Sequence, residues 1–221
     1  MPDDPSSPPP SVLRAHGGVL AAVWRGDPAG TMPWAGRRWF WLWVFVVNAV
    51  VGALAWTTVL LAVSRTASMV GRAALGLNSS VARPHVSGGQ LVQVAAAGLV
   101  VTFVVQVLRV GAVRLTFALR EAPARLAHAT LPVATGGAVI TVVYLYAFVV
   151  CLVPATSPWF GAVAAVVAAV PVLTAEILVF LVAERVVPLT RSLLVPHVAL
   201  TVAWAVAAGM VTALAVHLSP I

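Results

Sequence analysis

Long apolar runs separated by short polar connections dominate the pattern of the chain. Five of these runs contain about 20 residues each, which is the length of helix that crosses about 30 Å of hydrocarbon. The predicted fold class is therefore all-α, a polytopic integral membrane protein with a bundle of five transmembrane helices in residues 34–217. The spans are predicted at about 39–63, 91–108, 133–153, 160–183 and 197–217.

The chain before the first span divides into two parts. Residues 1–10 contain five prolines and little apolar surface, so they cannot offset the entropy of ordering and are predicted as a disordered tail. Residues 11–33 are predicted as a cytoplasmic amphipathic lead-in, because Val12, Val19 and Val23 recur at helical spacing behind Ser11, a suitable helix cap. We expect this interfacial helix to lie flat on the membrane surface.

The composition excludes an ordinary soluble domain. Hydrophobic residues make up 61% of the 221 residues and charged residues 9%, whereas a soluble protein carries roughly 25% charged residues. The net charge of +7 comes from 13 arginines and no lysine. In a membrane protein such an excess follows from topology, so nucleic acid is not expected as a partner. The use of arginine alone, alongside abundant Ala and Val, indicates a bacterial origin.

The arginines also predict the orientation of the spans. Cytoplasmic connections of membrane proteins carry an excess of Lys and Arg. We therefore expect a multi-pass protein of the cytoplasmic membrane, with its N-terminus in the cytoplasm and its C-terminus outside. Ten arginines fall on the cytoplasmic side in this topology: Arg14, Arg25, Arg37, Arg38, Arg109, Arg114, Arg120, Arg125, Arg185 and Arg191.

The stretch WAGRRWFWLW at residues 34–43 gathers aromatic and basic side chains at the start of the first span. In a helix, Trp39 and Trp43 share one face and Trp41 lies nearly opposite. Aromatic rings on all sides suit a membrane-interface anchor, and neighbouring arginines suit anionic lipid headgroups. Membrane lipids are thus an expected partner, and a headgroup-specific lipid site is the alternative interpretation. The anchor comprises Trp34, Arg37, Arg38, Trp39, Trp41 and Trp43.

Glu176 is the ionisable residue that lies deepest in a predicted span, about 12 Å from the end of that span near Glu184. A carboxylate at this depth needs a partner or a proton. The candidate partner is Arg109, because the apolar pattern of the second span continues beyond it as one long helix. One hypothesis is a buried salt bridge that fixes the register of the helices. The other is a proton- or ion-linked site that also uses Asn48 or Gln106.

The fifth predicted span carries small side chains at every fourth position. Such spacing gives a flat helix face that another helix can approach closely. The partner is expected to be another helix of the same chain, another membrane protein or a second copy of the chain. The helix-packing residues are Thr201, Ala205, Gly209 and Ala213.

Motifs for catalysis and metal binding do not occur in the sequence. No two histidines have a ligand spacing such as HExxH, so they are expected at interfaces or helix caps. The chain contains no nucleophile elbow, Walker loop or dinucleotide fingerprint. Its single cysteine, Cys151, lies in an apolar run. We therefore expect a protein that is not an enzyme and has no catalytic residues, no metal and no cofactor.

The order of five spans behind an amphipathic lead-in, with LAHATLPVATGGAVI at residues 126–140 introducing the third span, resembles the bacterial branch of the Ypt-interacting-protein (Yip) domain family. The likeness covers roughly residues 30–217. In eukaryotic members the resemblance implies membrane-trafficking roles with small GTPases and an Asp-Leu-Tyr-Gly-Pro stretch before the first span. That stretch is absent here, and the two tyrosines, Tyr144 and Tyr146, lie inside the third predicted span. Neither GTPase binding nor site residues are therefore carried over.

Together these patterns predict a non-enzymatic accessory, scaffold or membrane-organising subunit that acts by helix packing. The alternative is a transporter or channel component with a proton- or ion-linked site at Glu176. A polar, water-accessible cavity that reaches Glu176 would favour the transporter. A Glu176 paired with arginine, together with an exposed small-residue face, would favour the scaffold.

Overall fold

A computed structural model of the chain describes residues 11–74, 86–122, 125–153, 158–187 and 191–218. All the regular secondary structure in these residues is helical, which confirms the all-α fold class. The helices are α1 (Val12–Trp24), η1 (Ala29–Thr31), α2 (Met32–Ala35), α3 (Phe40–Ala74), α4 (Gly88–Ala118), α5 (Leu126–Leu152), α6 (Pro158–Val186) and α7 (Leu194–His217).

Within the described residues, five helices are long and apolar enough to cross a membrane, with mean hydropathies between 2.0 and 2.5. They correspond one to one with the five predicted spans, so the chain is a multi-pass membrane protein. The candidate spans are Phe40–Ser64, Gly88–Ala118, Leu126–Leu152, Val166–Val186 and Leu194–His217.

The second span, α4, is longer at both ends than the range 91–108 predicted for it. It begins at Gly88 because Ser87 and Gln90 form a capping box: the Gln90 N–H donates to Ser87 Oγ at 3.3 Å, and the Ser87 N–H donates to Gln90 Oε1 at 2.8 Å. At the other end the helix continues through Arg109 to Ala118. The expectation of one long helix that carries Arg109 is therefore confirmed.

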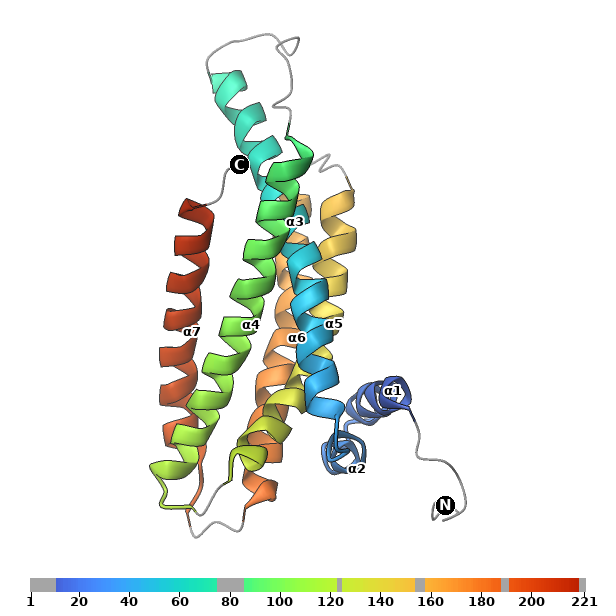
Figure 1. The fold of residues 1–221 in the computed structure, drawn as a ribbon, viewed down its shortest axis with the longest axis vertical. Helices are drawn as coiled ribbons and strands as arrows, with labels where there is room; N and C mark the ends of the chain where they lie inside the picture. Colours follow the sequence, from blue (N-terminus) through green and yellow to red (C-terminus); the bar gives the residue numbers. More distant parts are fainter. Residues whose placement is uncertain (1–10, 75–85, 123–124, 154–157, 188–190, 219–221) are drawn as a thin grey trace.

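The third span, α5, begins at Leu126, well before the predicted start at residue 133. The helix runs through Pro132, although proline cannot donate the backbone hydrogen bond of a helix interior. Figure 1 shows that the first turns of α5 depart from the direction of the rest of the helix. A proline is a usual cause of such a bend.

The spans pack as neighbours in a definite order. Helix α3 packs against both α4 and α5, α6 packs mainly against α5, and α7 packs mainly against α4 (Figure 1). Helix α7 therefore lies at the edge of the bundle. Helix α1 and the C-terminal ends of α4 and α6 lie toward one end of the bundle, and the C-terminal end of α7 lies at the other (Figure 1). We call the first of these the α1 end.

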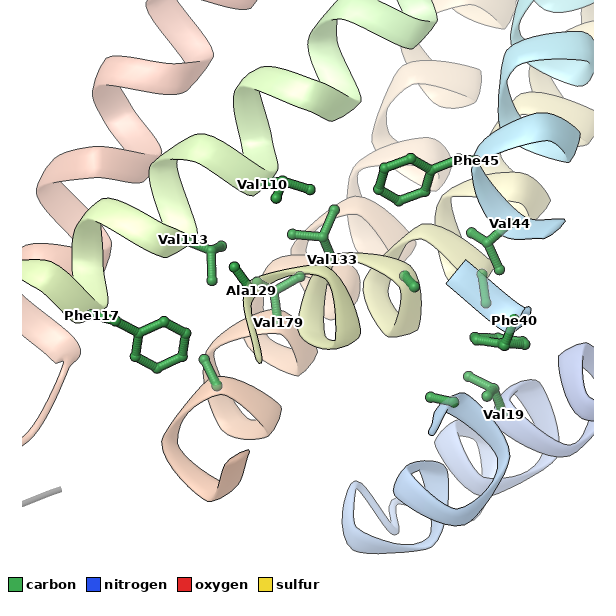
Figure 2. Packing of buried hydrophobic residues seen from close by; sticks show 14 of the residues in the cluster. Val19, Phe40, Val44, Phe45, Val110, Val113, Phe117, Ala129, Val133 and Val179 are labelled. Atoms are coloured by element: carbon green, nitrogen blue, oxygen red, sulfur yellow. The ribbon is translucent and has the colours of Figure 1, made fainter. Parts of the chain in front are cut away.

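The main apolar core lies toward the α1 end and draws on α1 and on four spans. Figure 2 shows Val19 of α1 beside Phe40 of α3, with Val44 one turn further along α3, and Phe117 of α4 near the side chains of α5 and α6. Above this core, Asn48 of α3 donates to the Gly137 carbonyl of α5 at 3.0 Å. The buried Asn48 thus fixes the register between α3 and α5.

Helix α1 is amphipathic, as predicted, but its valine face does not meet lipid. Ser11 caps the helix, since its Oγ accepts from the Arg14 N–H at 3.3 Å. The buried residues of α1 include Val19, which is fully covered by the main core, and Val23 packs against the same core. The prediction that this face rests on the membrane is therefore wrong for Val19, because the bundle offers it apolar side chains to bury against.

His16 gives the docking of α1 an expected pH dependence. The imidazole is 9% exposed, and burial lowers its pKa below the usual 6.5, opposed by a hydrogen bond with the backbone of Ala138. A lowered folded-state pKa means that the docked helix is fully stable above about pH 6.5 and loses stability as the pH falls through the lowered value. Hydrogen exchange of the α1 amides, corrected for intrinsic rates, should therefore be faster at pH 5 than at pH 7.5.

His16→Gln is the control for this prediction, because glutamine can donate a hydrogen bond but does not titrate. Its exchange, once corrected, should be the same at both pH values. Equal protection of α1 at pH 5 and pH 7.5 in the unaltered protein would contradict the prediction.

Candidate functional site

The structure brings Arg109 of α4 and Glu176 of α6 together as a salt bridge, as the sequence predicts. Nη2 of Arg109 donates to Oε2 of Glu176. The Arg109 side chain is 5% exposed and that of Glu176 is 26% exposed. Because neither α4 nor α6 packs mainly against the other, this pair is a polar link between helices that are otherwise held through their neighbours.

Helix α7 supplies two more contacts to the same guanidinium group. Nη1 of Arg109 donates to Oγ1 of Thr201 at 3.0 Å. The carbon of the guanidinium lies 4.8 Å from the centre of the Trp204 ring, a distance suited to a cation–π contact. The Trp204 indole N–H donates to the Val105 carbonyl of α4 at 3.0 Å, which holds the ring in place. Arg109 therefore joins α4, α6 and α7.

Two polar atoms near this link are buried without a hydrogen-bond partner in the described residues, Nε of Arg109 and Oε1 of Gln106. The Gln106 amide nitrogen donates to the Phe45 carbonyl of α3 and to the Thr102 carbonyl of α4, both at 3.3 Å. Gln106 therefore lies one turn before Arg109 and links α4 to α3. Buried polar atoms without partners raise the free energy of the folded state, so this layer of the bundle carries an energetic cost.

Asn48, the other residue considered for the site, is engaged elsewhere. Its Oδ1 accepts from Thr141 Oγ1 of α5 at 2.6 Å, in addition to the bond that its amide nitrogen donates to Gly137. Both ends of this side chain are thus occupied by α5. The hypothesis that Asn48 completes an ion-linked site with Glu176 is not supported by its contacts.

The histidines differ in their environments. His128 accepts from the Arg125 N–H at 3.2 Å and caps α5, as expected. His197 of α7 is instead buried, 5% exposed, with its ring 5.3 Å from that of Phe180. The expectation of interfacial or capping histidines is therefore wrong for His197 and also for the docked His16, because both lie where helices close over them.

The tryptophans of the predicted anchor occupy two kinds of position. Trp39, which directly precedes α3, is 54% exposed, and Trp41 in the first turn of α3 is 38% exposed; both lie where an interface anchor is needed. The guanidinium of Arg38 lies over the Trp39 ring at 5.1 Å. Trp34 and Trp43 are half-buried and pack against the main core. The remaining member of the set, Arg37, is half-buried with its guanidinium 5.5 Å from the Trp34 ring.

The four small-residue positions of α7 also differ in exposure: one contacts α4 and three are exposed. Thr201 faces α4 through its bond with Arg109. Ala205, Gly209 and Ala213 are exposed, and a Cβ added at Gly209 would meet nothing within 4 Å. None of the residues in the most apolar window of α7 is buried. We refer to Ala205, Gly209 and Ala213 as the small-residue face of α7.

A groove of about 420 Å³ lies between α5 and α6. Five apolar residues and Tyr146 line it, and neither Glu176 nor Arg109 is among them. In the described residues, no group of three or more His, Cys, Asp or Glu side chains is placed to hold a metal ion.

The fold and the buried pair define the class of the protein as a multi-pass α-helical membrane protein with an ion pair inside its bundle. No family model matches the chain, and neither a curated protein nor a solved structure matches it. The resemblance to the Yip domain family therefore stays a prediction from the sequence.

Trp204 is the residue of this site that the sequence reading missed. It follows Thr201 by three positions and therefore shares a helix face with it. A buried arginine inside a span needs polar or aromatic partners, so the Thr201–Trp204 pair was the available signal. The signal could not be used without knowing that α7 lies beside α4.

Proposed function

We propose that the protein is a non-enzymatic scaffold or accessory subunit that binds other membrane proteins, or a second copy of itself, through the small-residue face of α7. The observation that carries this proposal is the exposure of Ala205, Gly209 and Ala213 on a helix that packs mainly against α4. Small side chains allow a second helix to approach closely, and close packing is the main attraction between helices in lipid.

The buried pair supports the same proposal, because it contacts α7 one turn before the small-residue face begins. Arg109 holds Thr201 and Trp204, which fixes the rotation of α7 about its own axis. Because Ala205 follows Thr201 by one turn, the same contact also fixes the direction in which the small-residue face points. In this interpretation the salt bridge orients a docking helix and does not exchange ions.

We further propose that the protein resides in a bacterial cytoplasmic membrane with its α1 end in the cytoplasm. Ten of the 13 arginines belong to segments at this end in the five-span topology, and the positive-inside rule assigns such an end to the cytoplasm. A bacterial relative of the Yip domain proteins would have this arrangement.

A transporter or channel component is the second candidate. The observations in its favour are the 26% exposure of Glu176 and the unpartnered buried atoms of Arg109 and Gln106. A polar layer of this kind is typical of ion and proton pathways. The groove between α5 and α6 does not include Glu176 in its lining, so this groove gives the second candidate no support.

Gly209→Leu tests the scaffold proposal. The new side chain has open space around it, so the variant should fold with unchanged thermal stability while losing at least tenfold in its association with partners. The reason is that leucine separates helix backbones that glycine lets touch. The measurement is the size and composition of the complex purified in mild detergent, by native mass spectrometry.

The matched control is Gly111→Leu on α4. Gly111 is also exposed, and a Cβ added there also meets nothing within 4 Å, so this variant carries the same added bulk on another helix. It should retain the complex. If Gly209→Leu and Gly111→Leu both give complexes of the native size, the proposed role of α7 is wrong.

A further inference from the structure

Helix α1 has a second face that the bundle leaves uncovered. Ala15, Val19 and Ala22 on its inner face are fully buried. On the other side, Trp24 is 93% exposed and Leu13 is 68% exposed. At 100° per residue these two side chains point in nearly the same direction, about opposite to Ala22. Large apolar side chains in such a position are expected to meet a partner.

Two arginines flank this exposed apolar pair. Arg14 and Arg25 are both exposed and, by the same helical geometry, lie beside Leu13 and Trp24. From residue 11 to residue 25 the chain contains no acidic residue. The outer face of α1 is therefore apolar with a purely basic flank, which is complementary to an apolar layer bordered by negative charge.

The position of α1 in the fold indicates what kind of partner its exposed face meets. The helix packs against α3 and α5 and lies across the long axis of the bundle at the level where α3 begins (Figure 1). Phe40, the first residue of the first span, forms part of the core that covers Val19. The exposed Trp39 next to it marks the same level, which is the depth of lipid headgroups in an aromatic belt.

We infer that the outer face of α1 is a binding surface for anionic phospholipid at the membrane interface. Leu13 and Trp24 enter the boundary between headgroups and acyl chains, and Arg14 and Arg25 contact lipid phosphates. The inner face of the same helix stays packed on the bundle, so α1 connects the lipid surface to α3 and α5. This inference does not rest on the scaffold proposal, because it involves neither α7 nor the buried pair.

The first experiment locates the face by fluorescence. The full-length chain with Cys151→Ala and Leu13→Cys is labelled with an environment-sensitive dye and reconstituted in vesicles of phosphatidylcholine and phosphatidylglycerol. Leu13→Cys retains Trp24, Arg14 and Arg25. Arg191→Cys, at an exposed site in the connection before α7, is the matched aqueous control. Spin-labelled lipid should quench the label at residue 13. Aqueous iodide should quench this label at least fivefold less than it quenches the label at residue 191.

The second experiment tests the preference for negative charge. Spin-labelled phosphatidylglycerol should quench the label at residue 13 about fivefold more efficiently than spin-labelled phosphatidylcholine at the same mole fraction, a factor that corresponds to about 1 kcal/mol in total. The combined change Arg14→Gln and Arg25→Gln should remove this difference while leaving α1 docked, as judged by unchanged thermal unfolding.

Two results would overturn the inference. Equal iodide quenching at residues 13 and 191 would mean that the outer face lies in water and suits a soluble protein partner instead. Equal quenching by the two spin-labelled lipids in the protein with both arginines would mean that the surface does not recognise anionic lipid.

Discussion

Replacing Glu176 with leucine is expected to lower the free energy of unfolding by about 3 kcal/mol, because it leaves the guanidinium of Arg109 buried without its counter-ion. The Arg109 side chain is 5% exposed, so nearly all of it is shielded from solvent by the packed helices. Its remaining partners, Thr201 and the Trp204 ring, do not carry negative charge. The measurement is equilibrium unfolding of the purified protein in mixed micelles of mild detergent and sodium dodecyl sulfate.

The double change Arg109→Met with Glu176→Leu is the control, since it removes both charges and keeps apolar volume. Replacing a buried pair with apolar residues is often neutral, so the double variant should recover most of the stability lost by Glu176→Leu. The two single variants and the double variant complete a cycle that gives the coupling energy of the pair. A Glu176→Leu variant as stable as the unaltered protein would show that the pair does not form in solution.

Glu176→Gln separates the two candidate functions at the same position. Glutamine still accepts a hydrogen bond from Arg109 but neither ionises nor carries a proton. A scaffold should show unchanged ion flux in proteoliposomes together with reduced thermal stability. A transporter should lose its flux. Unchanged flux with lost stability would therefore eliminate an ion-linked role for Glu176.

The sequence was sufficient to predict the spans and the buried pair, and the reason is physical. A helix that crosses lipid must be continuously apolar over about 20 residues, so the five runs could be recognised without knowing how they pack. An ionised side chain in such a run needs a counter-charge. Only a few residues could supply it for Glu176, and Arg109 was the one within reach.

Contacts between helices could not be predicted in the same way. The periodicity of α1 indicates an amphipathic helix, but it does not say whether Val19 meets lipid or protein, because both are apolar. The start of α5 at Leu126 was missed because Pro132 disfavours helix locally, while packing of the first turns in the main core sustains it. The neighbouring helices determine whether Val19 is buried and where α5 begins. The order of residues along the chain does not show which helices are neighbours.

Gly136→Leu is expected to lower the free energy of unfolding by about 3 kcal/mol, because α5 and α6 are in contact at this glycine. A Cβ at Gly136 would lie 2.5 Å from Cγ2 of Val179 and 2.9 Å from the backbone oxygen of Ala175. The valine methyl group can move only against a neighbour that is itself packed, since Val179 is 3% exposed. The Ala175 oxygen is part of the α6 backbone, so the two helices must separate.

Gly111→Leu serves as the control for this effect as well, because both glycines lie inside long spans and the space around Gly111 is open. The change in helix propensity is the same at the two sites, so the difference between the variants isolates the close approach of α5 and α6. Separation of these helices would also displace Glu176, which follows Ala175 directly on α6. We therefore expect the double variant Gly136→Leu with Glu176→Leu to lose less free energy of unfolding than the sum of the two single losses. Additive losses would mean that the α5–α6 contact does not position the buried pair.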